Sequence, residues 1–498
     1  LGYLSDLASA SLLTVLLYRR PWWLALPVLL VWALLTLVSA ELVSAVGRMP
    51  NLADLHYLVD PQFVGNSTGG GLTHPDLGLA LLLGLVLWLV VQRAHRGVRP
   101  PALPRHSWSL PVLLLVAHGG IQYLKPSEAD QWQLFNLPHQ ALATATGQAQ
   151  MQVEDWLQGD VADAPPPMAG LTRLDLEGQP LLPSAGRARN VLLITLEGIP
   201  GAYIRTNREA LNSRYQEDLM PKLSAWAERG MNTPDYVLHS HQTIRGLYAM
   251  LCGDYDKLDN GTPKGVEMLT QSQRNQACLP AQMHKFGFNT HYLQGAGLRF
   301  MAKDKIMPHI GFDSTHGLEW FKNDNYLEFP WGKDDKAFFE GALGYVDQLK
   351  KNKKPWMLTL LTVGTHQPYS APEDYLERYE TPKQAAVGYL DDAIDQFLTG
   401  LERKGVLKDT LVIITSDESH GIDGVRLASS WGFNLMLAPD QDLLPHLKSG
   451  TYGHVDLSAS VLDYFGLPVP ASLSGRSLLR DYAQGREIMS YTNGKLRY

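Results

Sequence analysis

The long apolar runs of this 498-residue chain lie almost entirely before residue 125, and this asymmetry constrains the fold more than any other feature. A helix needs about 20 apolar residues to cross the hydrocarbon core of a bilayer. Four runs are predicted to be membrane helices, of which the fourth is less hydrophobic: Leu4–Tyr18, Pro21–Val46, Leu77–Val91 and Trp108–Leu124. Burial in a soluble core does not readily account for four such runs, and a cleaved signal peptide accounts for only one.

Basic residues between these runs predict their orientation, because cytoplasmic loops are enriched in Lys and Arg. Arg19 and Arg20 lie between the first two runs, and a cluster from Arg93 to Arg105 lies between the third and the fourth. We therefore expect both loops in the cytoplasm and everything after Lys125 outside. Leu1 is then also outside, and we expect a further helix upstream of it. The sequence predicts a multi-pass protein of the bacterial inner membrane, with its larger part in the periplasm or another extracytoplasmic space.

Charge and cysteine content exclude several classes of protein. The chain has 43 Lys and Arg against 50 Asp and Glu, a formal net charge of −7, and contains no basic block. This composition argues against a nucleic-acid partner. Two cysteines are too few for a disulfide scaffold, a Cys-rich zinc module or an iron–sulfur site. Both, Cys252 and Cys278, lie in the exported part, where an oxidising compartment favours a disulfide, with two buried free thiols as the alternative.

Three segments are predicted: a transmembrane helical domain (1–125), an interfacial helix and linker (126–188) and an extracytoplasmic catalytic domain (189–498). In the middle segment, QALATATGQAQMQVEDWLQ is typical of a helix and DAPPPMAG of a linker. From residue 189 on, short β-branched runs alternate with amphipathic stretches, which predicts an α/β domain with a mainly parallel sheet.

The predicted strands of this domain are Val191–Leu196, Asn289–Leu293, Met357–Val363, Leu411–Thr415 and Phe433–Leu437. The predicted helices are Leu219–Arg229, Ile244–Cys252, Asp335–Leu349, Gln384–Lys404 and Asp456–Phe465.

Polar residues follow four of these strands. In open α/β sheets, ligands bind beyond the carboxyl ends of the strands. Taken singly, each residue suits an ordinary role as a helix cap, a loop histidine or a solvated arginine. Their joint occurrence at strand ends predicts a functional site composed of Glu197, Arg299, His366, Asp417, Glu418 and His420.

Thr243 is the candidate nucleophile. It directly precedes an apolar helical stretch, where backbone N–H groups and the helix dipole favour an anion. Threonine also caps helices well, and the two roles are compatible. A threonine hydroxyl needs a metal or a base to become a good nucleophile. Glu197 and Asp417 are candidate ligands for that metal.

These residues together resemble the lipoteichoic-acid-synthase-like branch of the alkaline phosphatase/sulfatase superfamily, which includes membrane phosphoglycerol transferases. The resemblance rests on the order of LITLEG, GLRF, WGKDD, THQPY and SDESHG, and covers about residues 188–480 together with the apolar helices. It implies a bundle of about five membrane helices followed by an extracytoplasmic, sulfatase-like α/β domain.

The resemblance also implies a metal site. Glu197 matches the first metal carboxylate, Thr243 the nucleophile that also binds the metal, and Asp417 the carboxylate of an Asp-His metal pair. In place of Asp-His-x-Gly, this chain has SDESHG, so the next ligand is either Glu418 or His420. Glu418 would make an oxygen-rich site for Mn²⁺ or Mg²⁺, whereas His420 would bring it closer to a Zn²⁺ site. The resemblance favours Mn²⁺.

Four residues resemble the family's substrate-binding positions. Arg299 resembles the arginine that holds the glycerophosphate head group, and His366 resembles the phosphate-contacting histidine. Trp331, in the WGKDD turn, and His454, in the carboxy-terminal segment GHVDLSASVLDYFGLPVPASLSGRSLL, are further candidates.

The function implied is a membrane-anchored transferase that moves glycerophosphate from phosphatidylglycerol, through a covalent Thr243 intermediate, to an envelope polysaccharide or glucan. The apolar helices suit a donor confined to the lipid bilayer. A phosphoethanolamine transferase of the same superfamily and a non-catalytic lipid-sensing relative remain as alternatives. A sulfatase reaction is disfavoured, because Thr243-Ile244-Arg245 has neither the Cys or Ser nor the Pro of the C/S-x-P-x-R motif.

Overall fold

The computed structural model describes residues 1–46, 49, 74–94, 103–104, 106–125, 131–143, 173–255, 275–422, 424–425, 427–492 and 495–497. These residues fall into two compact units, one formed by the described residues up to 143 and the other by those from 173 on. Most of the predicted interfacial helix and its linker, residues 144–170, lie outside the described residues. The predicted boundaries at residues 125 and 188 stay predictions.

The four predicted apolar runs are helices. The first unit consists of α1 (Gly2–Leu17), α2 (Trp22–Val46), α5 (Pro75–Ala94), α6 (Ser109–Leu124) and the short α7 (Gln131–Leu134). Only α2 and α5 contain described stretches that are long and apolar enough to cross a membrane. Their apolar side chains are exposed, for example Leu34 and Leu87. Membrane insertion of all four helices, and their orientation, stay predictions.

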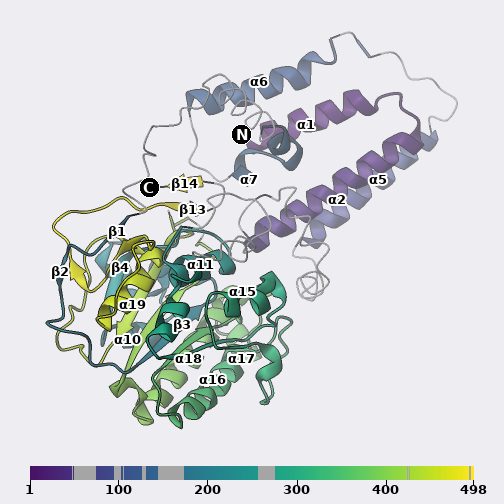
Figure 1. Cartoon of the computed structure of the whole chain (residues 1–498). Coiled ribbons are helices and arrows are strands. Elements are labelled where there is room, and N and C mark those ends of the chain that lie inside the picture. Colours follow the sequence, from purple (N-terminus) through teal and green to yellow (C-terminus); the bar gives the residue numbers. More distant parts are fainter. Residues whose placement is uncertain are drawn as a thin grey trace. The chain divides into compact units, whose positions relative to one another are not determined.

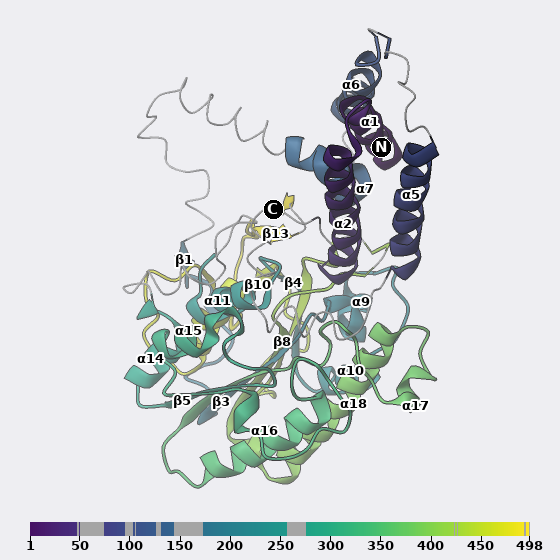
Figure 2. The same ribbon diagram turned by 90° about the vertical axis from the view of Figure 1, so that its right-hand side faces the viewer.

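The second unit is a three-layer α/β/α structure around an eight-stranded sheet (Figures 1 and 2). The strand order is β10-β4-β9-β8-β3-β7-β5-β6, and β9 alone among these eight runs antiparallel to its neighbours. This confirms the mainly parallel sheet. The strands are β3 (Asn190–Leu196), β4 (Met231–Val237), β5 (Asn289–Gln294), β6 (Ser314–His316), β7 (Trp356–Leu361), β8 (Thr410–Ser416), β9 (Trp431–Leu437) and β10 (Tyr452–Gly453).

Three small two-stranded sheets complete the described strands of this unit. They pair β1 (Leu174–Asp175) with β11 (Gly475–Arg476), β2 (Gln179–Pro180) with β12 (Arg480–Asp481), and β13 (Ser490–Thr492) with β14 (Lys495–Arg497).

Helices cover both faces of the central sheet and form two separate cores (Figure 1). One face carries α10 (Pro221–Ala227), α16 (Asp335–Lys350) and α18 (Pro382–Arg403). The other carries α11 (Thr243–Cys252), α14 (Leu279–Lys285), α15 (Lys303–His309) and α19 (Leu457–Tyr464). The remaining α-helices among the described residues of this unit are α9 (Arg205–Ala210) and α17 (Glu373–Leu376).

The position of β3 in the middle of the sheet explains why its sequence is continuously apolar. Alternate residues of a strand point to opposite faces. Val191 and Leu193 enter one core, whereas Leu192 and Ile194 enter the other. A parallel strand covered on both sides therefore has no solvent face on which polar residues would alternate.

All five predicted strands and all five predicted helices of this unit are present, with ends shifted by a few residues. Strands β4, β6 and β10 were not predicted. The sequence of β4, MNTPDYV, contains Pro and Asp, which are depleted in strands. The structure accommodates them at a shift in register between Thr233 and Tyr236.

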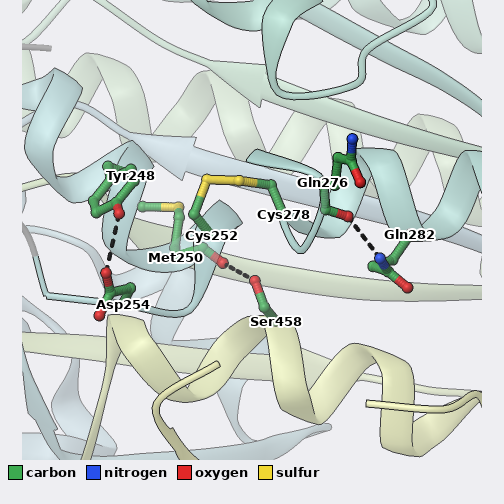
Figure 3. The surroundings of a disulfide bond; sticks show 8 residues. All are labelled: Tyr248, Met250, Cys252, Asp254, Gln276, Cys278, Gln282 and Ser458. Carbon is green, nitrogen blue, oxygen red and sulfur yellow. Dashed lines mark hydrogen bonds between the residues drawn. A yellow bond between two sulfur atoms is a disulfide. The ribbon is translucent and has the colours of Figure 1, made fainter. Parts of the chain in front are cut away.

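The disulfide favoured by the sequence is present. Cys252, the last residue of α11, is bonded to Cys278, which directly precedes α14 (Figure 3). Beside it, the Ser458 hydroxyl of α19 donates a hydrogen bond to the carbonyl oxygen of Met250 in α11, at 2.7 Å. Two neighbouring helices thus fix the carboxyl end of α11.

Removing the disulfide should destabilise the second unit. The bond closes a loop between residues 26 apart, and restricting the unfolded chain in this way contributes about 3 kcal/mol. We expect Cys252→Ala/Cys278→Ala to lower the thermal unfolding midpoint in detergent, followed by tryptophan fluorescence. Wild-type protein unfolded with a reductant should match the variant. Equal midpoints with and without the bond would contradict a stabilising role.

Candidate active site

The sheet brings the predicted acidic residues together at one edge. Strands β3 and β8 are parallel neighbours, and Leu196 pairs with Ser416 at their carboxyl ends. The residues that follow, Glu197 and Asp417, therefore leave the sheet side by side. Glu418 comes next along the chain, so three carboxylates lie at the edge where ligands of open α/β sheets bind.

The three acids form a compact, buried cluster. One carboxylate oxygen from each of Glu197, Asp417 and Glu418 lies within 4.8 Å of the others. Asp417 Oδ1 accepts hydrogen bonds from the backbone N–H groups of Gly198 (3.0 Å) and Glu418 (2.8 Å). Glu197 Oε1 and Asp417 Oδ2 accept none from the described residues. Buried carboxylate oxygens without partners are costly, and a divalent cation would satisfy them.

The acids differ in their affinity for protons. Burial, together with the charge of Asp417, raises the pKa of Glu197 well above its ordinary value. Burial and the charge of Glu418 raise the pKa of Asp417 to about 6. Burial acts in the same direction on Glu418, but His241, His420 and the Gln242 N–H together outweigh it and lower the pKa of Glu418 to about 2. A cation in this cluster would favour the ionised form of all three acids and so lower these pKa values.

The Thr243 hydroxyl lies against this cluster. Its Oγ1 donates a hydrogen bond to Glu197 Oε2 at 3.3 Å. Gln242 occupies the N-cap position and Thr243 is the first residue of α11, so the capping role is not observed. The residue before it, Gln242, has a φ of 110°, which is unfavourable for a side chain other than glycine. The N–H of Gln242 donates to Glu418. This bond holds the chain in the conformation in which α11 begins.

Two glycines allow the close packing of this region. A Cβ atom on Gly246, in the first turns of α11, would lie 1.9 Å from the carbonyl oxygen of Asp417. Gly198, at a φ of +69°, directly follows Glu197, and a Cβ there would lie 2.2 Å from the His420 ring. The nucleophile helix and the loop after β8 therefore both need glycine to approach the acids.

Both candidates for the last metal ligand lie near the cluster, at different distances. Glu418 belongs to the group of acids that could share one ion. The Nε2 of His420 is 3.9 Å from Glu197 Oε1, and its ring packs edge-to-face against Tyr369. Burial lowers the pKa of His420 well below its ordinary value, so this ring is neutral at pH 7.

His366 and Trp331 lie together. Their ring centroids are 4.3 Å apart, and the Trp331 indole N–H donates to the carbonyl oxygen of Gln367 at 2.6 Å. The Nδ1 of His366 is 2.8 Å from the same carbonyl oxygen. Because a carbonyl only accepts hydrogen bonds, Nδ1 carries the proton and Nε2 keeps its lone pair when the ring is neutral. Burial lowers the pKa of His366 and favours that neutral form.

The WGKDD turn supports the loop that carries His366. Asp334 caps α16 by accepting a hydrogen bond from the Ala337 N–H. Asp335 is buried and accepts the N–H of Gly364 at 3.1 Å. Burial raises the pKa of Asp335 to about 7.

The structure does not gather every predicted residue around the acids. Arg299, in the loop after β5, is exposed and has no ion pair within the described parts of the chain. His454 is fully buried, and its Nε2 lies 2.7 Å from the carbonyl oxygen of Ser416. His454 therefore contacts the strand end that carries Asp417.

Two residues near the acids were not predicted. Lys303, the first residue of α15, is 3% exposed. Burial lowers its pKa to about 8, and the three acids attract its charge. Met301 and Ala302, which precede it, have left-handed φ angles of 57° and 52°, a strain found at functional sites.

The second residue that was not predicted is His241, whose Nδ1 is 2.7 Å from Glu418 Oε2. Its only sequence signal is its place in HSHQT, two residues before the nucleophile.

Comparison with known proteins agrees with this fold. A family model described as Sulfatase matches residues 189–467, more than half of the chain. The chain therefore belongs to the sulfatase family, as the resemblance predicted.

Curated relatives match at low identity. The chain is 25% identical over 310 residues to lipoteichoic acid synthase 1 of Bacillus subtilis, a match that covers 57% of this chain and 46% of the relative. It is 25% identical over 528 residues to phosphoglycerol transferase I of Escherichia coli, which covers 95% of this chain and 61% of the relative. The chain thus spans less than two thirds of the length of these relatives.

Solved structures support the fold. The lipoteichoic acid synthase LtaP from Listeria monocytogenes matches with a TM-score of 0.50 and 16% identity, over 60% of this chain and 77% of that one. A protein in the alkaline phosphatase superfamily from Vibrio parahaemolyticus matches with a TM-score of 0.53 and 17% identity, over 68% and 79%. These likenesses confirm the predicted α/β architecture.

Gly246→Ala should displace the nucleophile helix. The added methyl group cannot fit against the Asp417 carbonyl, and overpacking of this kind costs about 1–3 kcal/mol. We expect a lower thermal unfolding midpoint and weaker binding of Mn²⁺, measured by calorimetry. Gly344→Ala is the matched control, since Gly344 lies in α16 with open space around its Cβ position. The control should be neutral or stabilising by up to about 1 kcal/mol. Equal behaviour of both variants would contradict the close approach.

Proposed function

We propose that this protein is a membrane-anchored, metal-dependent phosphoglycerol transferase. The observation that carries the proposal is the Thr243 hydroxyl at 3.3 Å from Glu197, beside two further buried carboxylates. The nature of the transferred group is supported by the relatives, whose names are phosphoglycerol transferase I and lipoteichoic acid synthase.

The acid cluster has the donor set of a divalent cation site. Glu197, Asp417 and Glu418 would hold the ion, with the Thr243 oxygen as a further ligand. When bound, the ion would lower the pKa of the Thr243 hydroxyl and stabilise negative charge on phosphate. An all-oxygen set suits Mn²⁺ or Mg²⁺ better than Zn²⁺, and we propose Mn²⁺.

In the first half-reaction, Thr243 Oγ gives up its proton and attacks the phosphorus of phosphatidylglycerol. A bond from Oγ to phosphorus forms, and the bond from phosphorus to the diacylglycerol oxygen breaks. Glu197, the acceptor of the Thr243 hydroxyl, passes the proton from Oγ on to that oxygen, diacylglycerol leaves, and glycerophosphate remains on Thr243. In the second half-reaction, an acceptor hydroxyl loses its proton to His366 and attacks the same phosphorus. The bond from phosphorus to Thr243 Oγ breaks, and Oγ takes up that proton.

His366 is the proposed base for the acceptor hydroxyl. Its Nδ1 proton is engaged by the Gln367 carbonyl, so Nε2 is the nitrogen that can take a proton. Trp331 packs on the ring and holds its orientation.

Arg299 and Lys303 supply positive charge for the phosphate oxygens. Lys303 is already attracted by the acid cluster, and Arg299 lies four residues before it, in the segment that leads into α15.

The proposed location follows from the donor. Phosphatidylglycerol is confined to the bilayer, and α2 and α5 have the length and composition of membrane spans. We propose a multi-pass protein of the bacterial inner membrane, with the second unit on the extracytoplasmic side. An envelope polysaccharide or glucan is the proposed acceptor.

Thr243→Ala should abolish the reaction. Detergent-purified protein, head-group-labelled phosphatidylglycerol and Mn²⁺ should yield diacylglycerol and a labelled Thr243 peptide with the wild type. Without the hydroxyl, we expect turnover to fall by at least about 1000-fold and the labelled peptide to disappear. Thr243→Ser, which keeps a hydroxyl, should retain part of the activity and the label. Full activity of the alanine variant would remove the nucleophile assignment.

Glu418 rather than His420 should contribute the last ligand. Glu418→Gln keeps the shape but removes the charge, and we expect Mn²⁺ affinity to fall by more than about 10-fold, since even outer partners of metal ligands contribute that much. His420→Ala should cause a smaller loss. Isothermal titration of Mn²⁺ into each purified variant decides between them, and a larger loss for His420→Ala would reverse the assignment.

A further inference from the structure

His241 lies outside the motifs that define the site, yet it contacts one of the acids directly. Its Nδ1 is 2.7 Å from Glu418 Oε2. An ionised carboxylate only accepts hydrogen bonds, so Nδ1 is the donor. The side chains of both residues are largely buried, at 13% and 9% exposure, which protects the pair from water and salt.

The same carboxylate oxygen also receives the backbone N–H of Gln242. Both donors come from the segment that leads into Thr243, and Gln242 is held there at a φ of 110°. Two donors on one oxygen fix the direction of the carboxylate. They leave the other oxygen, Oε1, for a different ligand.

We propose that His241 is a positioning residue that orients Glu418 as a metal ligand and links the nucleophile segment to the metal site. This inference rests on the proposed function insofar as it requires a divalent cation at the acid cluster. Ligating carboxylates are themselves hydrogen-bonded in metal sites, and the loss of such a partner lowers metal affinity. In the SDESHG context, an imidazole thus supports a carboxylate ligand, and the ligand set stays all oxygen.

A purely structural role for the pair would give a different result. If His241 only closes the loop before α11, its removal would lower stability and leave metal affinity unchanged in the folded protein. Metal affinity measured directly on the full-length chain separates the two roles.

The experiment titrates Mn²⁺ into detergent-purified, metal-free protein by isothermal calorimetry. We expect His241→Leu, which has no donor, to weaken binding by about 10- to 100-fold. His241→Asn keeps an N–H donor near the position of Nδ1 and should restore most of the affinity. Unfolding midpoints of the metal-free proteins identify any variant that fails to fold.

A matched control is available on α14. His284 Nδ1 is 2.8 Å from Asp313 Oδ1, so this pair has the same chemistry, and neither residue belongs to the acid cluster. His284→Leu should leave Mn²⁺ affinity unchanged.

The outcomes distinguish failure of the positioning role from failure of the metal-dependent function. If the wild type binds Mn²⁺ and His241→Leu binds it equally well, the positioning role is wrong and the proposed transferase is unaffected. If His241→Asn binds as weakly as His241→Leu, the N–H donor is not the cause and the inference also fails. If the wild type binds no Mn²⁺, both the inference and the metal-dependent function are overturned.

Discussion

Parallel pairing of β3 with β8 buries two carboxylates side by side, where water cannot screen their charges. Glu197 and Asp417 leave the sheet in register, and Glu418 adds a third acid within the same few ångströms. Such a cluster is unfavourable unless protons, N–H donors or a cation compensate it. The chain supplies some compensation itself, through the backbone of Gly198 and the side chain of His241. The negative charge that these donors do not compensate makes this edge of the sheet suited to a divalent ion.

The position of the nucleophile depends on this cluster and on the packing behind it. Thr243 stands at the start of a short helix whose far end is fixed by the Cys252–Cys278 bond and by Ser458. Its near end lies on the Asp417 carbonyl, where only glycine fits at position 246. The fixed helix α11 on one side and the hydrogen bond to Glu418 on the other hold Gln242 in place. These contacts maintain its unfavourable φ angle next to the reacting group.

The sequence predicts the parts of the site that follow from strand ends. A continuously apolar run such as NVLLITL marks a strand buried on both faces, and the residue after it is placed by the sheet alone, which is why Glu197 and Asp417 could be found. The choice between Glu418 and His420 depends on how one loop folds back, which no local pattern encodes. Lys303 and His241 were missed for a related reason. Lys303 matters because the tertiary structure buries it beside the acids. His241 matters because it pairs with Glu418, more than 170 residues away in the sequence. The spacing of motifs indicates neither.

The reversed direction of β9 places the connection from β8 to β9 entirely beside the acids. Connections between the parallel strands cross from one edge of the sheet to the other, whereas the connection from β8 to the antiparallel β9 starts and ends at the same edge. That stretch begins with Asp417 and Glu418, and both of its ends lie at the edge of the sheet that carries the acids. Insertions or substitutions there can reshape access to the acids without disturbing strand pairing, whereas the segment after β9 emerges at the opposite edge, away from the acids.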